Sequence, residues 1–174
     1  MRKSSIPNIF TYINLSFGIL SIVATYENQF FFAALFIICA ALVDRYDGRV
    51  ARFLNVSSDL GKELDSLADL VSFGVAPAVL TFISYGFKEV GILGYALMLI
   101  FPICGAFRLA RFNSTEFDGS FRGVPITIAG SVIAAFDLIT TKMGIVAGKP
   151  TIWPILLMIL FSYLMVSKLE LKKF

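Results

Sequence analysis

Long apolar stretches separated by short polar ones occupy most of the chain. A helix needs about 20 mostly apolar residues to cross the hydrocarbon core of a bilayer. The stretches that meet or approach this length cover residues 8–26, 29–49, 62–85, 91–107, 124–141 and 151–167. The pattern therefore predicts an all-α integral membrane protein, built as a bundle of about six transmembrane helices.

The connections between these stretches indicate which helices are neighbours. Residues 27–29 leave room only for a tight hairpin, so the first two helices are expected to be antiparallel neighbours. A loop of about a dozen residues then joins the second helix to the third. The chain has no internal repeat and no linker of biased composition, so residues 1–174 are expected to form a single domain.

Composition narrows the class of protein and of chemistry. A hydrophobic share of 57% and a mean hydropathy of +0.82 exclude an ordinary soluble domain. The chain has no histidine, so the usual general base and the commonest zinc ligand are missing. Cys39 and Cys104 each lie inside an apolar stretch, which favours two buried thiols over a disulfide.

The basic residues divide unequally when both termini are placed on one side of the membrane. On that side fall Arg2, Lys3, Arg45, Arg49, Arg52, Lys62, Arg108, Arg111, Arg122, Lys168, Lys172 and Lys173, and opposite them fall Lys88, Lys142 and Lys149. The positive-inside rule then puts both termini in the cytoplasm of a multi-pass protein of the cell membrane. This sidedness favours anionic headgroups or phosphate-bearing substrates. The scattered helix-end positions do not form the basic stripe typical of nucleic-acid binding.

Acidic residues stand out at the ends of two consecutive apolar stretches. The surrounding pattern consists of Asp44, Asp47, Gly48, Ala51, Arg52, Gly61, Asp65 and Asp69. Residues three or four apart share one face of a helix, so the four carboxylates form two pairs that a short loop can bring together. Charged groups at such positions cost several kcal/mol unless they are compensated, and they are usually functional.

Converging carboxylates in a medium of low dielectric constant repel one another, and divalent cations relieve that repulsion. Oxygen-only ligation suits hard ions, so Mg²⁺ or Mn²⁺ is expected and Ca²⁺ is possible. Two such ions would form the clamp that is used in phosphoryl chemistry. The structural alternative is a set of ordinary helix-end salt bridges, in which Asp44 pairs with a neighbouring arginine and Asp65 or Asp69 pairs with Lys62.

The spacing Asp44-x2-Asp47-Gly48-x2-Ala51-Arg52-x8-Gly61-x3-Asp65-x3-Asp69 resembles that of the CDP-alcohol phosphatidyltransferases at every position. Stretches at residues 7–18, 61–77, 104–113, 121–126 and 162–168 are similar to the small bacterial and archaeal phosphatidylserine synthases within that family. The resemblance implies a membrane enzyme, commonly a homodimer, that transfers a phosphatidyl group from CDP-diacylglycerol to the hydroxyl of L-serine and releases CMP.

The resemblance also implies roles for single residues. Two divalent ions would be held by Asp44, Asp47, Asp65 and Asp69, and the CDP pocket would be lined by Gly48, Ala51, Arg52 and Gly61. Asp69 is the usual catalytic candidate for activating the acceptor, and we expect it to be the deepest of the four carboxylates on its helix. Metal ligation lowers the basicity of a carboxylate, so the ions would supply part of that activation.

Candidate acceptor or phosphate ligands lie at the cytoplasmic end of the fourth stretch and just beyond it, at Arg108, Arg111, Asn113 and Arg122. Arginine suits two-point binding of a carboxylate or a phosphate, but basic residues at a cytoplasmic helix end need no substrate. Asp137 is expected at the opposite membrane face, in an interfacial pair with Lys142.

Two alternatives to serine transfer remain at this stage. The first keeps the chemistry and changes the acceptor to glycerol 3-phosphate or an inositol phosphate, which would demand more converging cationic residues than a zwitterion does. The second is a non-enzymatic cation transporter, which would distribute acidic residues along a path through the bilayer.

Overall fold

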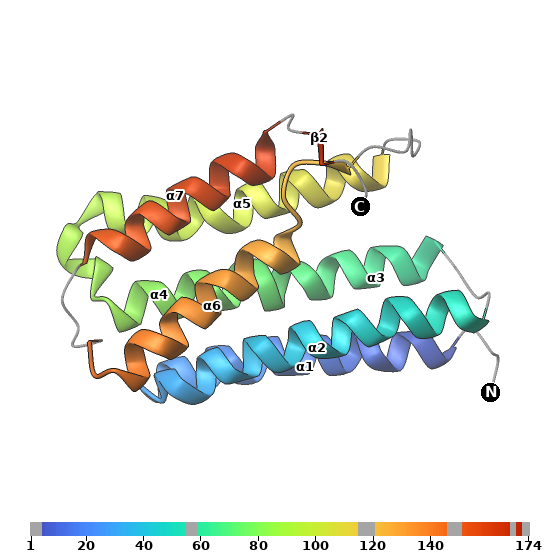
Figure 1. The fold of residues 1–174 in the computed structure, drawn as a ribbon, viewed down its shortest axis with the longest axis horizontal. Coiled ribbons are helices and arrows are strands. Elements are labelled where there is room, and N and C mark those ends of the chain that lie inside the picture. Colours follow the sequence, from blue (N-terminus) through green and yellow to red (C-terminus); the bar gives the residue numbers. More distant parts are fainter. Residues whose placement is uncertain (1–4, 55–58, 115–120, 146–150, 168–169, 172–174) are drawn as a thin grey trace.

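The chain forms a bundle of helices that run back and forth along one axis (Figure 1). In this computed structural model the backbone is described for residues 5–54, 59–114, 121–145, 151–167 and 170–171, and the side chains of residues 5–8, 47–54, 121–122 and 170–171 are left out of the description. The helical elements are α1 (Ser5–Tyr26), α2 (Phe30–Leu54), α3 (Asp59–Asp69), η1 (Leu70–Val75), α4 (Ala76–Ser84), η2 (Phe87–Val90), α5 (Ile92–Ser114), α6 (Ile126–Lys142) and α7 (Ile152–Val166).

The predicted all-α membrane architecture is confirmed. The third predicted helix consists of α3, the π-helical turn η1 and α4, which follow one another without a break. Among the described residues, three helical segments are long and apolar enough to cross a membrane, namely Ile9–Tyr26, Asp59–Ser84 and Ile92–Ser114. Helices α6 and α7, with 17 and 15 residues, fall below the usual spanning length of about 20.

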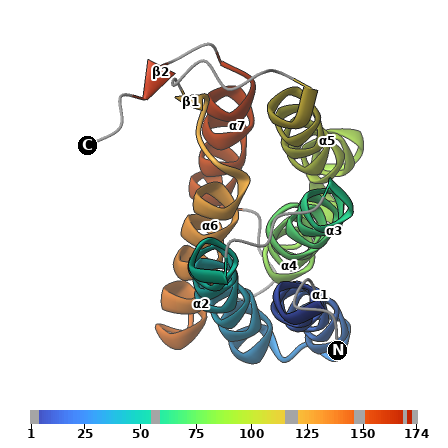
Figure 2. The same cartoon turned by 90° about the vertical axis from the view of Figure 1, so that its right-hand side faces the viewer.

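The end-on view shows how the helices pack (Figure 2). Helices α1 and α2 lie side by side as an antiparallel hairpin, as the short connection predicts, and α5 pairs with α7. Helix α6 packs on α2, and the η1 turn lies between α1, α5 and α6. The strands β1 (Phe121–Arg122) and β2 (Glu170–Leu171) form a short antiparallel pair, an addition to the predicted helices.

Small residues let two helices approach the backbone of η1. A Cβ atom added to Gly18 of α1 would lie 2.9 Å from the Cα atom of Ser72, and one added to Gly130 of α6 would lie 2.7 Å from the Cα atom of Phe73. Real Cβ atoms essentially never approach so closely. Glycine at both positions therefore holds η1 tightly between α1 and α6.

Asp137 corrects a prediction. It is fully buried within the bundle, and its Oδ2 atom accepts a hydrogen bond from the Thr81 hydroxyl of α4 at 2.9 Å rather than pairing with Lys142. The exposed Lys142 is therefore not what stabilises it. The periodicity of a helix places Asp137 correctly on its own element but does not say which face packs inward. Cys39 and Cys104 are free thiols, as predicted, but each is half-buried rather than fully buried.

Candidate metal centre

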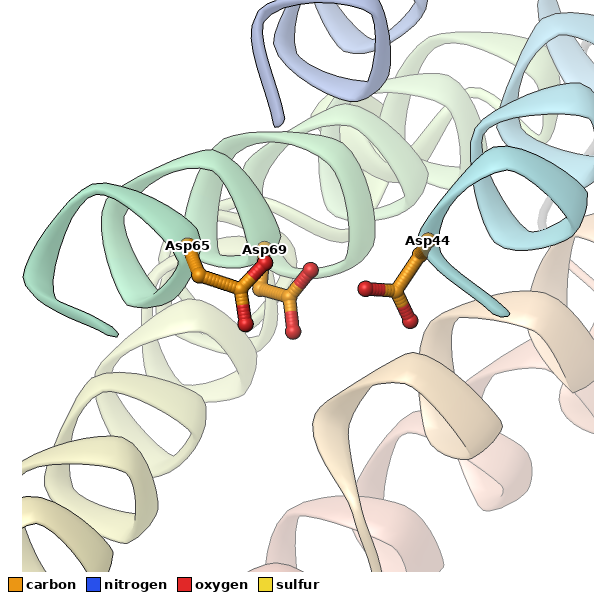
Figure 3. A group of neighbouring side chains, drawn as sticks. All are labelled: Asp44, Asp65 and Asp69. Atoms are coloured by element: carbon orange, nitrogen blue, oxygen red, sulfur yellow. The ribbon is translucent and has the colours of Figure 1, made fainter. Parts of the chain in front are cut away.

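Three carboxylates from two helices converge within the bundle, beside the start of α6. Asp44 comes from α2, and Asp65 and Asp69 come from α3 (Figure 3). One carboxylate oxygen of each lies within 4.8 Å of those of the other two. The structure thus brings together three of the four aspartates that the sequence analysis selects.

Local helix geometry places the two aspartates of α3. Asp65 and Asp69 are separated by four residues, so both side chains project from the same face. Asp69 is the last residue of α3, directly before the π-helical turn η1. Single π-helical turns are frequent at functional sites. This turn contacts α1, α5 and α6 and thereby places Asp69 among three helices.

Because the carboxylates are partly buried, their mutual repulsion costs free energy unless a cation compensates it. Asp69 is only 7% exposed, and Asp44 and Asp65 are half-buried. Two unit charges 4.8 Å apart repel by about 3.5 kcal/mol at an effective dielectric constant of about 20. Lys62 forms a salt bridge with Asp59, at 3.8 Å on the surface of α3.

Two neutral donors from other helices hold the Asp69 carboxylate. The side-chain amide of Asn14 in α1 donates from Nδ2 to Oδ1 of Asp69 at 3.0 Å. The hydroxyl of Thr127 in α6 donates to Oδ2 at 3.4 Å. Neither Asn14 nor Thr127 was predicted from the sequence as part of the site. The available signal was an asparagine in the middle of an apolar stretch, where an amide needs a partner.

The donor set fits a hard divalent cation. Mg²⁺, Mn²⁺ and Ca²⁺ prefer carboxylate oxygens, and these three aspartates offer such atoms from two rigid helices without histidine or cysteine. The hydrogen bonds on Asp69 are the kind of outer contact that orients a metal-binding carboxylate. Asp44, Asp65 and Asp69 could therefore hold a metal ion.

The remaining residues of the predicted pattern are only partly described. Helix α2 continues through Asp47, Gly48, Ala51 and Arg52, but their side chains lie outside the described residues. Gly61 lies on α3 one turn before Asp65. The roles of these residues in binding metal or CDP stay predictions.

The predicted acceptor or phosphate ligands Arg108 and Arg111 make different contacts. The guanidinium of Arg108 is buried, interacts electrostatically with Asp69, and has no hydrogen-bond partner for Nε among the described residues. Arg111 instead donates to the carbonyls of Met165 and Val166 at the end of α7, at 3.3 and 3.1 Å. Arg108 is therefore close enough to Asp69 to be influenced by its charge, whereas Arg111 bonds to the end of α7.

Asn113 ties the end of α5 to α3. Its Nδ2 atom donates to the Ser66 hydroxyl at 3.0 Å and to Oε1 of Glu63 at 3.3 Å. The side chain of Arg122 lies outside the described residues, although its backbone belongs to β1. An acceptor role for Asn113 and Arg122 stays a prediction.

Comparison with known proteins gives a consistent result. The family model "CDP-alcohol phosphatidyltransferase" matches residues 4–169. A CDP-diacylglycerol–serine O-phosphatidyltransferase of Bacillus subtilis is 38% identical over 97% of this chain and 90% of its own length. One of Helicobacter pylori strain J99 is 37% identical over 97% of this chain and 72% of its own length. An archaetidylserine synthase of Methanothermobacter thermautotrophicus is 34% identical over 95% of this chain and 69% of its own length.

These relatives cover nearly the whole bundle, including the helices that carry the three converging aspartates. The chain belongs to the CDP-alcohol phosphatidyltransferase family.

Proposed function

We propose that this protein transfers a phosphatidyl group from CDP-diacylglycerol to the hydroxyl of L-serine, giving phosphatidylserine and CMP. The convergence of Asp44, Asp65 and Asp69 within a membrane bundle carries the proposal, because these carboxylates could hold the divalent cation whose positive charge phosphoryl transfer needs. The names of the relatives from Bacillus subtilis and Helicobacter pylori support serine as the acceptor.

The proposed reaction is a displacement at phosphorus. The serine hydroxyl oxygen forms a bond to the phosphorus that carries the diacylglycerol, the bond from that phosphorus to the CMP oxygen breaks, and CMP leaves. Asp69 takes the hydroxyl proton at Oδ2, the oxygen whose bond from Thr127 is longer than the bond that Asn14 makes to Oδ1. When bound, divalent metal neutralises the phosphate oxygens and lowers the charge repulsion at the reacting centre.

The predicted ligand set for two ions comprises Asp44, Asp47, Asp65 and Asp69, with Mg²⁺ or Mn²⁺ as the preferred metal. Gly48, Ala51, Arg52 and Gly61 line the nucleotide pocket in this proposal. Arg108 binds the serine carboxylate or a donor phosphate, since its buried guanidinium is influenced by the charge of Asp69 and its Nε has no hydrogen-bond partner among the described residues.

The proposed site opens to the cytoplasm, where serine and CMP are soluble. The excess of basic residues on the side that holds the termini supports this orientation. In Figure 1, α1 begins at the same end of the bundle as the carboxyl end of α2 and the start of α3, and α7 runs toward that end. From the family resemblance we also propose a homodimer, which light scattering on the detergent-solubilised protein tests.

A transfer assay tests the acceptor. Purified protein is given CDP-diacylglycerol and Mg²⁺ or Mn²⁺, with radiolabelled serine in one reaction and radiolabelled glycerol 3-phosphate or inositol phosphate in parallel reactions. We expect label to enter lipid from serine and CMP to appear in equal amount, and EDTA to abolish both. Label that enters lipid only from a phosphorylated acceptor would overturn the serine assignment.

Substitution of Asp69 tests the proton acceptor. Asp69→Asn keeps the size of the side chain but removes its charge, so we expect kcat to fall by at least about 100-fold, the usual contribution of a general base. Asp59→Asn is the matched control, because Asp59 is exposed at the start of the same helix. Near-normal turnover by Asp69→Asn would rule out Asp69 as the base.

A further inference from the structure

The side-chain amide of Asn14 in α1 forms a hydrogen bond with Asp69 on another helix. Asn14 is fully buried in α1, and its Nδ2 atom donates to Oδ1 of Asp69 at 3.0 Å. An ionised carboxylate can accept hydrogen bonds but cannot donate them. The side-chain amide of Asn14 must therefore turn its nitrogen toward Asp69. Its oxygen, Oδ1, is left buried without a partner among the described residues.

This orientation is unfavourable for stability taken alone. A buried acceptor without a donor is costly, and an apolar side chain of similar size would avoid that cost. By contrast, the buried hydroxyl of Thr25, near the other end of α1, donates to the Ser21 carbonyl of its own helix. The arrangement at Asn14 is therefore explained by its contact with Asp69 rather than by the packing of α1.

The backbone around Asn14 is fixed on the same element that carries Asp69. The Ser72 hydroxyl of η1 donates to the Asn14 carbonyl at 3.0 Å. One turn later in α1, Gly18 packs directly on Ser72, and a Cβ atom there would lie 2.9 Å from the Ser72 Cα atom. These contacts hold α1 against η1 at a fixed height, so the Asn14 amide reaches Asp69 in one geometry.

We infer that Asn14 is a positioning residue, which fixes the rotation of the Asp69 carboxylate so that it contributes to the cluster with Asp44 and Asp65. Repulsion from these two neighbours would otherwise turn an ionised Asp69 away from them. The expected effect of Asn14 on turnover rests on the proposed function. Its expected effect on cation binding does not, because cation binding by the cluster is measured separately.

A double-mutant cycle in Mn²⁺ affinity tests the inference on the full chain in detergent. Mn²⁺ binding is measured by electron paramagnetic resonance for wild type, Asn14→Leu, Asp69→Ala and the double variant. We expect Asn14→Leu to weaken binding about tenfold or more, the usual effect of losing a contact that orients a metal ligand. In the Asp69→Ala background the same change should have less than about a twofold effect, because no carboxylate remains to be oriented.

Thr25→Val is the matched control, since it also replaces a buried polar group of α1 but lies away from Asp69. It should change Mn²⁺ affinity by less than about twofold. In the transfer assay, Asn14→Leu should lower kcat by about 10-fold to 100-fold and change the KM for serine by less than about threefold. Asn14→Ala serves for the same measurements if Asn14→Leu does not fold.

Wild-type Mn²⁺ affinity in a folded Asn14 variant would overturn the inference. So would an equal loss of affinity with and without the Asp69 side chain, or a wild-type protein that binds no Mn²⁺. If the Mn²⁺ cycle behaves as expected while the wild type transfers nothing to serine, the positioning role of Asn14 is supported and the proposed function fails.

Discussion

At the scale of single residues, Arg108 and Arg111 differ although they lie three positions apart on α5. Arg108 interacts with the charge of Asp69, whereas Arg111 binds carbonyls at the end of α7. We predict that Arg108→Gln raises the KM for serine or for CDP-diacylglycerol by at least about tenfold, because a charged contact to the substrate is lost. Its thermal midpoint should stay within a few degrees of the wild-type value.

Arg111→Gln is the natural comparison for that experiment. It removes hydrogen bonds to Met165 and Val166, so it should lower the free energy of unfolding by about 1–3 kcal/mol and leave both KM values within about twofold. Steady-state kinetics and thermal unfolding of the two variants separate the roles. A higher KM for Arg111→Gln at unchanged stability would reverse the assignment.

The sequence predicts the carboxylates of this site better than it predicts their partners. Helical spacing was sufficient to pair Asp65 with Asp69 and to select Asp44. It could not identify Asn14 or Thr127, which reach Asp69 from helices 55 and 58 positions away in the chain. Such contacts depend on helix rotation and packing height, which no local pattern encodes.

At the scale of elements, the π-helical turn η1 depends on the two glycines that pack on it. We predict that Gly130→Ala lowers the free energy of unfolding by about 1–3 kcal/mol, because the new Cβ atom would lie 2.7 Å from the Phe73 Cα atom and α6 must move. Thermal unfolding in detergent measures this. Val132→Leu, which enlarges a side chain that is 40% exposed on the same helix, should change stability by less than about 0.5 kcal/mol.

Asp137 and Thr81 give a second test at this scale. Their hydrogen bond joins α6 to α4, and Tyr85 bonds Thr140 beside it. Thr81→Val keeps the shape of the side chain but removes the hydroxyl that Asp137 accepts from, so the free energy of unfolding should fall by about 1–3 kcal/mol. Thr25→Val should cost less, because the Thr25 hydroxyl bonds its own helix. Equal losses would mean that the contact between helices contributes nothing specific.

The same pair explains why the sequence misplaces Asp137. The positive-inside pattern and the nearby Lys142 favour a position at the membrane surface, and the spacing along α6 is compatible with it. The structure instead buries the carboxylate inside the bundle, where its Oδ2 atom accepts a hydrogen bond from Thr81 of α4. The pairing by the short hairpin was predictable, whereas the rotation of α6 and the extension of α2 to Leu54 and of α5 to Ser114 were not.

At the scale of the whole molecule, orientation in the membrane decides whether the carboxylates can reach serine. Ser114 ends α5 at the end of the bundle where α2 ends and α3 begins, and Lys88 lies in η2 at the opposite end. Both are exposed. In a chain whose Cys39 and Cys104 are replaced by alanine, Lys88→Cys and Ser114→Cys therefore report the two membrane faces separately.

We predict that a membrane-impermeant maleimide added to intact bacterial cells labels Lys88→Cys and leaves Ser114→Cys unlabelled until the cells are opened. The physical reason is the excess of lysine and arginine on the side of the termini, which by the positive-inside rule favours the cytoplasm for that side. The cysteine-free parent controls for labelling at other groups, and retained serine transfer shows that each variant is folded. The opposite labelling pattern would place the site outside the cell and separate it from its soluble substrates.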